Sequence, residues 1–428
     1  MRAWSPEQVA EAAGARLVAV AGRTAAGPGR VVVDSRHARS GDLFVGLPGE
    51  RVDGGRFAAD VLGAGAWGVL VGEGWAGIDV EDATILVAAD PLVALGRLAT
   101  AWRRALGAQV IGVTGSTGKT STKDVLAAML GARRRVVATR ENRNTEVGLP
   151  LTILGAPEGT EVLVLEMAMR GRGQIAEPDV GVITNVGPVH LELLGSIEAI
   201  AETKAELLAH LRPGHGTAVI PADEPLLDEY RPDGVATTTF GPGGDVIELP
   251  PSLRLTVDGR PPSMHMERNA LAALAAARAV GVEPEGDLDV AVSALRGQRR
   301  ELPGGVVVID DCYNANPMSM RAALDDLAAS SGSRRVAVLG DMLELGPDEL
   351  RFHEAIGAHA RATGIDLLVT VGPLAQAMGP AFCGPAHPVP TAADAVPLLR
   401  GLLQPGDVVL VKGSRGVGLE VVAQGLAA

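Results

Sequence analysis

Short apolar runs alternate with longer helical segments along most of this 428-residue chain. The runs include "EVLVLEMA", "VGVITNVG", "RRVAVLGDM" and "GDVVLVKGS", which are rich in Val, Ile and Leu. Segments such as "SIEAIAETKAELLAHL" separate them and have the character of helices. Continuous β-branched runs between helices are typical of parallel strands that helices cover on both faces. The pattern therefore predicts an α/β fold with parallel sheets.

Three blocks of this pattern follow one another, and we expect three domains. Residues 1–105 contain "RVVVDSR", "DLFVGLPG", "GVLVG" and "TILVA" between Gly- and Asp-rich turns, and end in the helical stretch "DPLVALGRLATAWRRAL". Residues 106–296 begin with a strand that leads into a glycine-rich loop, and residues 297–428 carry four further apolar runs. A chain of this length is too long for one ordinary core, which agrees with several domains.

The composition narrows the class of protein. Apolar residues make up 47% of the chain and aromatic residues only 3%, so the cores must be built from Val, Leu, Ile and Ala. The formal net charge of −13 argues against nonspecific nucleic-acid binding, because such binding needs basic surface to displace counterions. The two cysteines, Cys312 and Cys383, are too few for a disulfide framework or a zinc site.

The N-terminus does not have the pattern of a signal peptide. Ser5, Pro6 and Gln8 are typical of an N-cap, a first-turn proline and a capping-box partner, so we expect a short helix that Gly14 ends. No apolar run approaches the ~20 residues that cross a bilayer. We therefore expect a soluble, cytoplasmic protein without membrane insertion.

The segment "VIGVTGSTGKTSTKDVL" has the form of a strand, a glycine-rich turn and a helix that opens with Lys119 and Thr120. The strict pattern G-x-x-x-x-G-K-[ST] is not met, because Val113 stands five residues before Gly118. Gly115 and Gly118 still allow a tight turn whose N–H groups, with the helix N-terminus, hold the β- and γ-phosphates of a nucleotide. Lys119 would supply a mobile cation, and Thr120 a hydroxyl for magnesium. The residues expected to bind nucleotide here are Gly115, Ser116, Thr117, Gly118, Lys119, Thr120 and Ser121.

This loop, with only two residues between its glycines, resembles that of the Mur ligase family and its folylpolyglutamate synthetase relatives. "VLVLEMAMRG" places Glu166 at the end of a buried strand, and "ITNVGPVHLELLGSIEAIAETKAEL" places Lys204 fourteen residues after His190. In the family the matching glutamate and histidine bind magnesium, and the matching lysine is carbamylated by carbon dioxide. A lysine must be neutral to react in this way, so burial that lowers its pKa would help. The resemblance implies ATP and two Mg²⁺ ions, with Thr120, Glu166, His190 and a carbamylated Lys204 at the metal site.

The third block contains the sharpest match, to one branch of the family. "GQRRELPGGVVVIDDCYNANPMSM" is similar to a family stretch with a "GR-x-E" arginine followed by "DD-x-YNANP-x-SM". The match implies that Arg299 reaches the γ-phosphate and that Asp311 accepts hydrogen bonds from the ribose, with Arg300 as the alternative arginine. Cys312 is interpreted as a packing residue, because no partner is spaced to activate its thiol. The expected catalytic set is Lys119, Glu166, His190, Lys204 and Arg299.

Further polar residues fall where the family contacts its ligands. "MHMERNALAALAAARAVGV" resembles a helix start at which His265 and Asn269 lie near the adenine; Met266 and Arg268 depart from the usual residues, so Asn269 is the contact we expect. The segments "RENRNTEVGLPLTIL", "DDCYNANP" and "VLVKGSRGVGLEVV" supply the expected peptide-substrate contacts, which are Asn142, Asn144, Thr145, Asn314, Asn316, Lys412 and Ser414. "VAVLGDMLELG" follows the same branch of the family.

The stretch "DSRHARSGDLFVGLPGERVDGGRF" in the first block looks like the uridine-diphosphate-sugar domain of some Mur ligases. Ser35 and Arg36 are the residues expected to bind substrate there. Gly55 replaces a histidine that is common after "DG", which is a departure from the family. The matching residues are Asp34, Ser35, Arg36, Gly41, Asp42 and Phe44.

The resemblance covers almost the whole chain and implies three domains. These are an N-terminal UDP-sugar-binding α/β domain in residues 1–105, a central P-loop ATPase domain with a mostly parallel sheet in 106–296, and a C-terminal Rossmann-like α/β domain in 297–428 that binds an incoming dipeptide. The implied reaction is the ATP-dependent joining of D-alanyl-D-alanine to UDP-N-acetylmuramoyl-tripeptide through an acyl phosphate, catalysed by a monomer.

Two other functions stay open at this point. A sister ligase would add the third, diamino-acid residue of the peptide, but it resembles "DYAH-x-P" where this chain has "DDCYNANP". A P-loop NTPase without peptide-bond chemistry is the other alternative, and the spacing of Lys204 and the irregular loop argue against it. The sequence also leaves open whether the third peptide residue is lysine or diaminopimelate.

Overall fold

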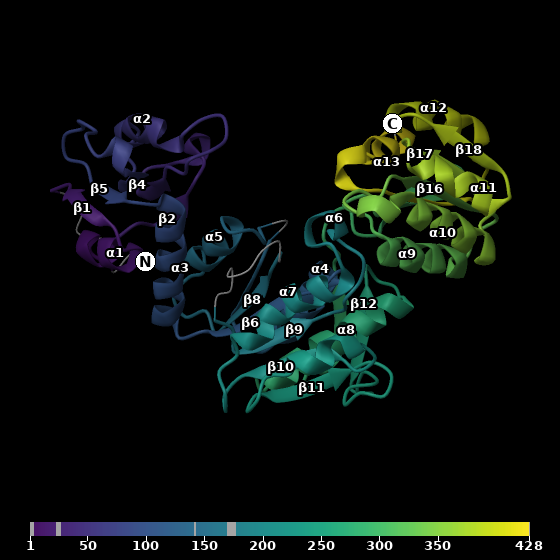
Figure 1. Cartoon of the computed structure of the whole chain (residues 1–428), viewed down its shortest axis with the longest axis horizontal. Coiled ribbons are helices and arrows are strands. Elements are labelled where there is room, and N and C mark those ends of the chain that lie inside the picture. Colours follow the sequence, from purple (N-terminus) through teal and green to yellow (C-terminus); the bar gives the residue numbers. More distant parts are fainter. Residues whose placement is uncertain (1–3, 23–26, 141–142, 169–176, 428) are drawn as a thin grey trace. The chain divides into compact units, whose positions relative to one another are not determined.

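The structure is a computed structural model that describes residues 4–22, 27–140, 143–168 and 177–427 (Figure 1). Helices alternate with strands along the chain and most strand pairs are parallel, so the predicted α/β class is confirmed. Two compact units are present: of the described residues, 4–22, 27–113, 130–140, 143–168 and 177–180 form one, and 114–129 and 181–427 form the other. The domain boundaries expected near residues 105 and 296 stay predictions.

Across the described segments, no helix combines the length and the apolar character that a membrane span requires.

The N-terminal part of the first unit is a five-stranded sheet with its helices. Its elements are α1 (Pro6–Ala13), β1 (Arg16–Ala19), β2 (Arg30–Val32), η1 (Ser35–His37), β3 (Asp42–Val45), η2 (Gly54–Phe57), α2 (Ala58–Gly63), β4 (Gly68–Gly72), η3 (Glu73–Trp75), β5 (Ile85–Ala88) and α3 (Pro91–Leu106). The strand order is β1-β5-β4-β3-β2, with β1 antiparallel to β5 and the other pairs parallel. Apolar side chains of β3, β4 and β5 pack against α2.

The predicted capping box is present at the start of α1. Ser5 Oγ accepts a hydrogen bond from the Gln8 backbone N–H, and Gln8 Oε1 accepts one from the Ser5 N–H at 2.8 Å. Pro6 is the first helical residue and Gly14 is the C-cap. The short helix therefore forms where the local sequence satisfies its terminal N–H groups.

The middle of the chain builds a six-stranded sheet and a separate strand pair. Its elements are β6 (Gln109–Thr114), α4 (Lys119–Gly131), β7 (Val136–Ala138), α5 (Gly148–Leu154), β8 (Val162–Glu166), β9 (Val180–Ile183), α6 (Leu191–Leu194), α7 (Ile197–Ala209), β10 (Thr217–Pro221), η4 (Pro225–Tyr230), β11 (Ala236–Phe240), β12 (Leu253–Val257), α8 (Met264–Ala279) and β13 (Gly286–Val290). The sheet has the order β11-β10-β9-β6-β8-β7, and the pairs β6–β8, β7–β8 and β10–β11 are parallel. β12 and β13 form a parallel pair of their own.

The C-terminal part of the second unit is a six-stranded sheet covered on both faces. Its elements are β14 (Gln298–Leu302), β15 (Val306–Asp310), α9 (Pro317–Ala329), β16 (Arg335–Gly340), η5 (Gly346–Asp348), α10 (Glu349–Ala362), β17 (Leu367–Val371), η6 (Ala375–Ala377), α11 (Met378–Phe382), β18 (Ala386–Val389), α12 (Ala392–Leu402), β19 (Val408–Lys412), η7 (Arg415–Val417) and α13 (Glu420–Ala427). In the order β14-β15-β19-β16-β17-β18, only the edge strand β14 runs antiparallel.

Alternate residues of the central strands enter two different cores, which shows why these strands are apolar throughout. Leu339 and Leu410 pack with α9, α10 and α11, whereas Val338 and Val411 pack with α12 and α13. Figure 1 shows α9 and α10 on one side of β16 and β17, and α12 on the other. This doubly covered sheet places loops from several strands together at its carboxyl edge, where open α/β sheets bind ligands.

Candidate active site

The glycine-rich segment is a loop between the end of β6 and the start of α4, as the sequence predicts. Gly115 has φ 147° and Gly118 has φ 75°, conformations that residues with side chains rarely adopt. A Cβ on Gly115 would clash with Thr184 Oγ1, and a Cβ on Gly118 would clash with Asn269 Oδ1. Both glycines are therefore required by the shape of a loop that leads directly into a helix N-terminus, an arrangement that binds phosphate.

A second segment, which no motif had identified, holds this loop in place. Asn185 Oδ1 accepts a hydrogen bond from Thr117 N at 2.9 Å, and Asn185 Nδ2 donates to Thr117 Oγ1 at 2.9 Å. Thr184 Oγ1 donates to the Thr117 carbonyl at 2.5 Å. Ser116 Oγ donates to the Gly187 carbonyl at 3.0 Å and accepts from Gly187 N at 2.8 Å. The available signal was the polar pair Thr184–Asn185 directly after the apolar run "VGVI", because polar residues at a strand's carboxyl end often serve a ligand site.

Two lysines influence each other at the loop. Lys119 Nζ donates to the carbonyl of Gly115 at 2.6 Å and lies 3.4 Å from that of Ser116, so the side chain folds back over the loop. Lys204 on α7 is only 3% exposed. Burial, and in second place the charge of Lys119, lowers the pKa of Lys204 to about 7. At neutral pH a large share of Lys204 is therefore the neutral amine.

Glu166 lies at the carboxyl end of β8, in register with Val113 of β6, and is 2% exposed. Its Oε1 accepts a hydrogen bond from Asn144 Nδ2 at 2.9 Å, whereas Oε2 is buried without a hydrogen-bond partner among the described residues. A buried carboxylate oxygen that lacks a partner is costly unless a cation binds it, and a hard cation such as Mg²⁺ prefers oxygen ligands. Glu166 therefore fits the predicted metal site. Thr145 Oγ1 accepts from Gly148 N at 3.3 Å, and Asn142 lies outside the described residues.

His190 directly precedes α6 in a left-handed conformation, with φ 54°. Its Nδ1 pairs with the carboxylate of Glu344, and its side chain is a quarter exposed. A carboxylate on one ring nitrogen fixes the orientation of an imidazole, as is usual behind metal-binding histidines. The geometry of His190 therefore also fits the predicted role.

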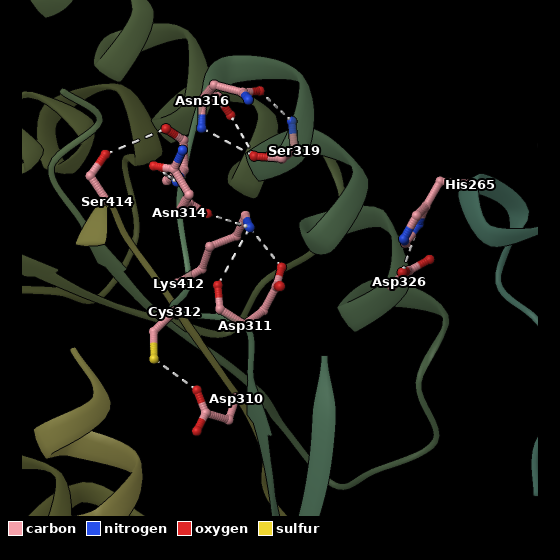
Figure 2. Close-up of polar contacts among 11 residues, drawn as sticks. His265, Asp310, Asp311, Cys312, Asn314, Asn316, Ser319, Asp326, Lys412 and Ser414 are labelled. Atoms are coloured by element: carbon pink, nitrogen blue, oxygen red, sulfur yellow. Dashed lines mark hydrogen bonds and ion pairs between the residues drawn. The ribbon is translucent and has the colours of Figure 1, made fainter. Parts of the chain in front are cut away.

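Helix α8 carries the two predicted adenine-site residues, which have different surroundings. Asn269 is buried beside Gly118 of the phosphate loop. His265 Nδ1 lies 2.9 Å from Asp326 Oδ2 of α9 (Figure 2). Burial is the largest single effect and disfavours the imidazolium, but the hydrogen bond to Asp326 and the charges of Asp326 and Asp311 together raise the pKa of His265. Asn269 adjoins the phosphate loop, whereas His265 serves as an ion-pair partner.

Arg299 lies on the edge strand β14, where its Nη2 donates to Ser330 Oγ at 2.8 Å. Burial, followed by the charge of Arg260, lowers the pKa of Arg299 from its ordinary value. Arg300 is its neighbour on the same strand, and adjacent residues of a strand point to opposite faces. One ligand on one face of β14 can therefore use only one of the two arginines, and the choice of Arg299 stays a prediction.

The "DDCYNANP" segment forms a loop at the carboxyl ends of β15 and β19 (Figure 2). Lys412 Nζ donates to Asp311 Oδ2 at 2.6 Å and to the Asn314 carbonyl at 3.1 Å. Asn316 Oδ1 accepts from Ser319 N at 2.9 Å and forms the N-cap of α9. The structure thus brings the predicted Asp311, Asn314 and Lys412 together, and it gives Asn316 a helix-capping role that the motif did not indicate.

The predicted substrate contacts at the end of β19 are buried. Lys412 has a side chain that is 3% exposed, and Ser414 is equally enclosed. Ser414 Oγ accepts from Leu343 N at 3.0 Å and lies 3.4 Å from the Ala315 carbonyl, to which it donates (Figure 2). Their polar atoms are bonded within this part of the chain, and their contact with substrate stays a prediction.

Cys312 is a core residue, as predicted, and packs among apolar side chains of β15, β19 and α13. Its Sγ donates to Asp310 Oδ1 at 2.8 Å (Figure 2). Burial and this carboxylate raise the pKa of the thiol, so the thiolate nucleophile does not form at neutral pH.

The first-block motif lies on and around η1. Asp34 is the N-cap of η1, and its carboxylate accepts three hydrogen bonds from Arg36. The Arg36 backbone N–H donates to Oδ1 at 3.0 Å, Nε donates to Oδ1 at 2.9 Å, and Nη2 donates to Oδ2 at 2.7 Å. This hydrogen-bonded pair keeps the pKa of Asp34 well below its usual range. Ser35 is half-buried beside them. Gly55 stands where a side chain would clash with the ring of Trp75, which explains its presence in place of a larger residue.

Comparisons with known proteins identify the family of this chain. A model of the Mur ligase middle domain matches residues 113–277, and a model of the Mur ligase, glutamate ligase domain matches residues 295–415. The chain is 40% identical over 418 residues to the UDP-N-acetylmuramoyl-tripeptide–D-alanyl-D-alanine ligase of Synechocystis, a match that covers 93% of this chain and 92% of the relative.

Two solved structures resemble nearly the whole chain. The crystal structure of MurF from Acinetobacter baumannii is 30% identical with a TM-score of 0.84, covering 99% of this chain and 98% of that one. The crystal structure of MurF ligase from Thermotoga maritima in complex with ADP is 31% identical with a TM-score of 0.81, covering 93% and 97%. Because it has the phosphate loop, matches two Mur ligase domain models and resembles these relatives over nearly its entire length, the chain belongs to the Mur ligase family.

Proposed function

We propose that this chain is an ATP-dependent ligase that joins D-alanyl-D-alanine to UDP-N-acetylmuramoyl-tripeptide. The observation that carries the proposal is the 40% identity to the Synechocystis ligase of that name over more than nine tenths of both chains. The geometry supports it, because the chain combines a phosphate loop, a buried carboxylate with an unpaired oxygen and a lysine of lowered pKa.

The reaction converts a poor acyl donor into a good one. A carboxylate oxygen of the tripeptide attacks the γ-phosphorus of ATP, the bond from that phosphorus to the bridging oxygen breaks, and ADP leaves. The amine of the dipeptide then attacks the acyl carbon of the resulting acyl phosphate and loses a proton. The bond from the acyl carbon to the phosphate oxygen breaks, and inorganic phosphate leaves.

The protein contributes positioning and charge neutralisation, the main requirements of phosphoryl transfer. The loop N–H groups from Gly115 to Ser121 hold the phosphates, and Lys119 exchanges the Gly115 carbonyl for a γ-phosphate oxygen. Arg299 adds a second cation. Asn269, beside Gly118, and Asp311, at the carboxyl edge of the C-terminal sheet, hold the adenosine.

We assign two Mg²⁺ ions to Thr120, Glu166 and His190, each of which is considered by itself. Glu166 offers a buried oxygen without a partner, His190 has a carboxylate on Nδ1, and Thr120 supplies the hydroxyl after the loop lysine. Bound magnesium would neutralise phosphate charge during the transfer. Among the residues that the structure describes, no group of three or more His, Cys, Asp and Glu side chains is placed to hold a metal ion, so the assignment rests on Glu166 and His190 taken singly.

Lys204 is proposed to carry a carbamate. Its neutral amine attacks carbon dioxide, an N–C bond forms, and one proton is released to leave an anionic carbamate. The pKa of about 7 supports this step, since the reactive amine is abundant at neutral pH. The modification would replace an uncompensated buried amine by an anion that attracts Lys119 and a metal ion.

The remaining contacts belong to the two substrates. We assign Ser35 and Arg36 to the uridine-diphosphate sugar, and Asn142, Asn144, Thr145, Asn314 and Asn316 to the peptide parts. The enzyme is proposed to act as a monomer in the cytoplasm, on small molecules and without nucleic-acid partners.

The test is phosphate release from ATP and Mg²⁺ with UDP-N-acetylmuramoyl-tripeptide and D-alanyl-D-alanine, together with the mass of the product. A second arm supplies the dipeptide precursor with a free diamino acid, and a third supplies no acceptor. Tripeptides ending in lysine or in diaminopimelate are compared by kcat/KM, which identifies the third residue. Lys119→Met should lower kcat by about 100-fold, while the exposed Arg104→Ala serves as the matched control.

The three arms separate the alternatives. Release that needs D-alanyl-D-alanine, with a product heavier by one dipeptide, supports the proposal. Release only in the diamino-acid arm would move the chain to the preceding step of the same pathway. Steady release without an acceptor would contradict amide-bond formation and favour a nucleotide hydrolase.

A further inference from the structure

Strand β19 ends in a buried cation that has no hydrogen-bond donor left for a substrate. Lys412 Nζ lies 2.6 Å from Asp311 Oδ2, 3.1 Å from the Asn314 carbonyl and 3.5 Å from the Asp311 carbonyl (Figure 2). An ammonium group has three N–H donors and no acceptor. Each donor of Lys412 therefore has an acceptor within the "DDCYNANP" loop, and the side chain is only 3% exposed.

Asp311 is held asymmetrically by this contact. Lys412 binds its Oδ2, and the carboxylate remains 20% exposed at the carboxyl edge of the sheet. The Asp311 backbone is also fixed, since its N–H donates to the Val411 carbonyl at 2.9 Å. A charge-assisted hydrogen bond from Lys412 thus fixes Oδ2 of Asp311, and Oδ1 can accept a hydrogen bond from a ligand.

Ser414, two residues after Lys412, forms hydrogen bonds to a second loop, the one that follows β16. Its backbone N–H donates to the Asp341 carbonyl at 3.0 Å, and its Oγ accepts from Leu343 N. Asp341 Oδ1 in turn accepts from Ala375 N at 2.7 Å. Residues 412–414 therefore connect the loop after β15 with the loop after β16.

We propose that Lys412 is a positioning residue that presents Asp311 to the nucleotide ribose and does not touch the dipeptide. The ammonium fixes both the carboxylate of Asp311 and the carbonyl of Asn314, so that removing it lets the loop and its carboxylate reorient. The proposal deepens the proposed function and rests on the role of Asp311 toward the ribose hydroxyls.

An ion pair at the amino ends of strands in the same sheet provides a matched control. Arg334 Nη2 lies 2.6 Å from Asp407 Oδ2, and Asp407 is fully buried. Arg334 and Asp407 directly precede β16 and β19, whereas Asp311 and Lys412 lie at the carboxyl ends of β15 and β19. Arg334→Met removes the cation that pairs with the buried Asp407, and no ligand role has been given to Arg334.

The experiment measures the affinity for MgADP by isothermal titration calorimetry in wild type, Lys412→Met, Asp311→Asn, the double variant and Arg334→Met. Lys412→Met and Asp311→Asn should each weaken MgADP binding about 10- to 100-fold, the range of one charge-assisted hydrogen bond. The double variant should bind MgADP at most about threefold more weakly than either single variant, because both substitutions remove the same interaction between Lys412 and Asp311. Arg334→Met should lower stability and leave the affinity for MgADP unchanged.

Steady-state kinetics supply the second readout. Lys412→Met should raise KM for ATP and leave KM for D-alanyl-D-alanine unchanged, and Lys412→Arg should restore part of the ATP affinity. If Lys412→Met does not fold, Lys412→Gln takes its place, since it removes the charge but keeps an amide donor for Asn314.

The outcomes are distinct. Losses that add in the double variant, or unchanged MgADP affinity in Lys412→Met, would overturn the positioning role. A raised KM for the dipeptide with normal MgADP affinity would make Lys412 a substrate contact instead. Because calorimetry with MgADP needs neither peptide substrate, a failed ligase assay would refute the proposed function and still leave this test decisive.

Discussion

Replacing Lys204 by methionine should make the protein more stable. Lys204 is 3% exposed, and its pKa falls from 10.5 to about 7 because burial disfavours the ammonium. At about 1.36 kcal/mol for each pH unit, this difference corresponds to about 5 kcal/mol of destabilisation below pH 7. Methionine has a similar shape and no charge. Allowing for relaxation around the site, we expect Lys204→Met to raise the free energy of unfolding by about 2 to 5 kcal/mol at pH 7.

The sign of the pH dependence follows from proton binding. Between pH 7 and 10.5 the unfolded chain holds the Lys204 proton and the folded protein does not, so the stability of the wild type rises with pH. Lys204→Met lacks this contribution. Its advantage over the wild type should therefore be largest near pH 7 and disappear as the pH approaches 10.5.

Urea denaturation at pH 7, 8, 9 and 10 in buffers free of carbon dioxide measures the effect. Lys123→Met is the matched control, because Lys123 is equally buried but lies 2.7 Å from Asp124 Oδ1. Its loss should destabilise the protein by about 1 to 3 kcal/mol, since Asp124 then lacks its cation. Added bicarbonate should stabilise the wild type and leave Lys204→Met unaffected. A Lys204→Met variant that is less stable than wild type at pH 7, or whose advantage is independent of pH, would refute the reasoning.

Three further predictions concern the loop glycines, the helix cap and the thiols. Gly118→Ala should abolish tight MgATP binding in calorimetry, because Gly118 has φ 75° and the added Cβ would clash with Asn269. Gly131→Ala, at the end of α4, is the control: its Cβ meets no other atom, so MgATP binding should be unchanged. Normal MgATP binding by Gly118→Ala would contradict the loop geometry. Asn316→Ala should lower the free energy of unfolding by about 1 kcal/mol in urea, while Asn316→Asp keeps the cap and its stability; equal losses would exclude the capping role. Iodoacetamide should label Cys383 alone in the folded protein, as judged by mass spectrometry, because Cys312 is buried and its pKa is raised; rapid labelling of Cys312 would show that its core opens.

Several features could be predicted from local sequence because local chemistry decides them. The apolar runs form the expected strands, and the capping box of Ser5 and Gln8 forms as expected, since each depends on residues within a few positions. The phosphate loop also follows from its own glycines, Gly115 and Gly118, which alone permit its backbone conformation.

Other features depend on segments far apart in the sequence, and the motifs could not show them. Asn185 holds Thr117 across 68 positions, and it was missed because a single Asn after a strand has no distinctive pattern. The unpaired oxygen of Glu166 became visible only once burial and its neighbours were known. The sequence motif predicts that Lys412 contacts substrate, yet its three donors are directed to a loop about 100 residues earlier.

By itself, the sequence determined the α/β class, the strand and helix positions and the residue types of a nucleotide-dependent ligase, because periodicity, capping and glycine content act over short distances. Only the tertiary structure decided which of those polar residues are exposed to a ligand and which are bonded to the chain. The physical reason is that the pKa of Lys204 and the saturation of Lys412 depend on desolvation and on partners brought together by folding.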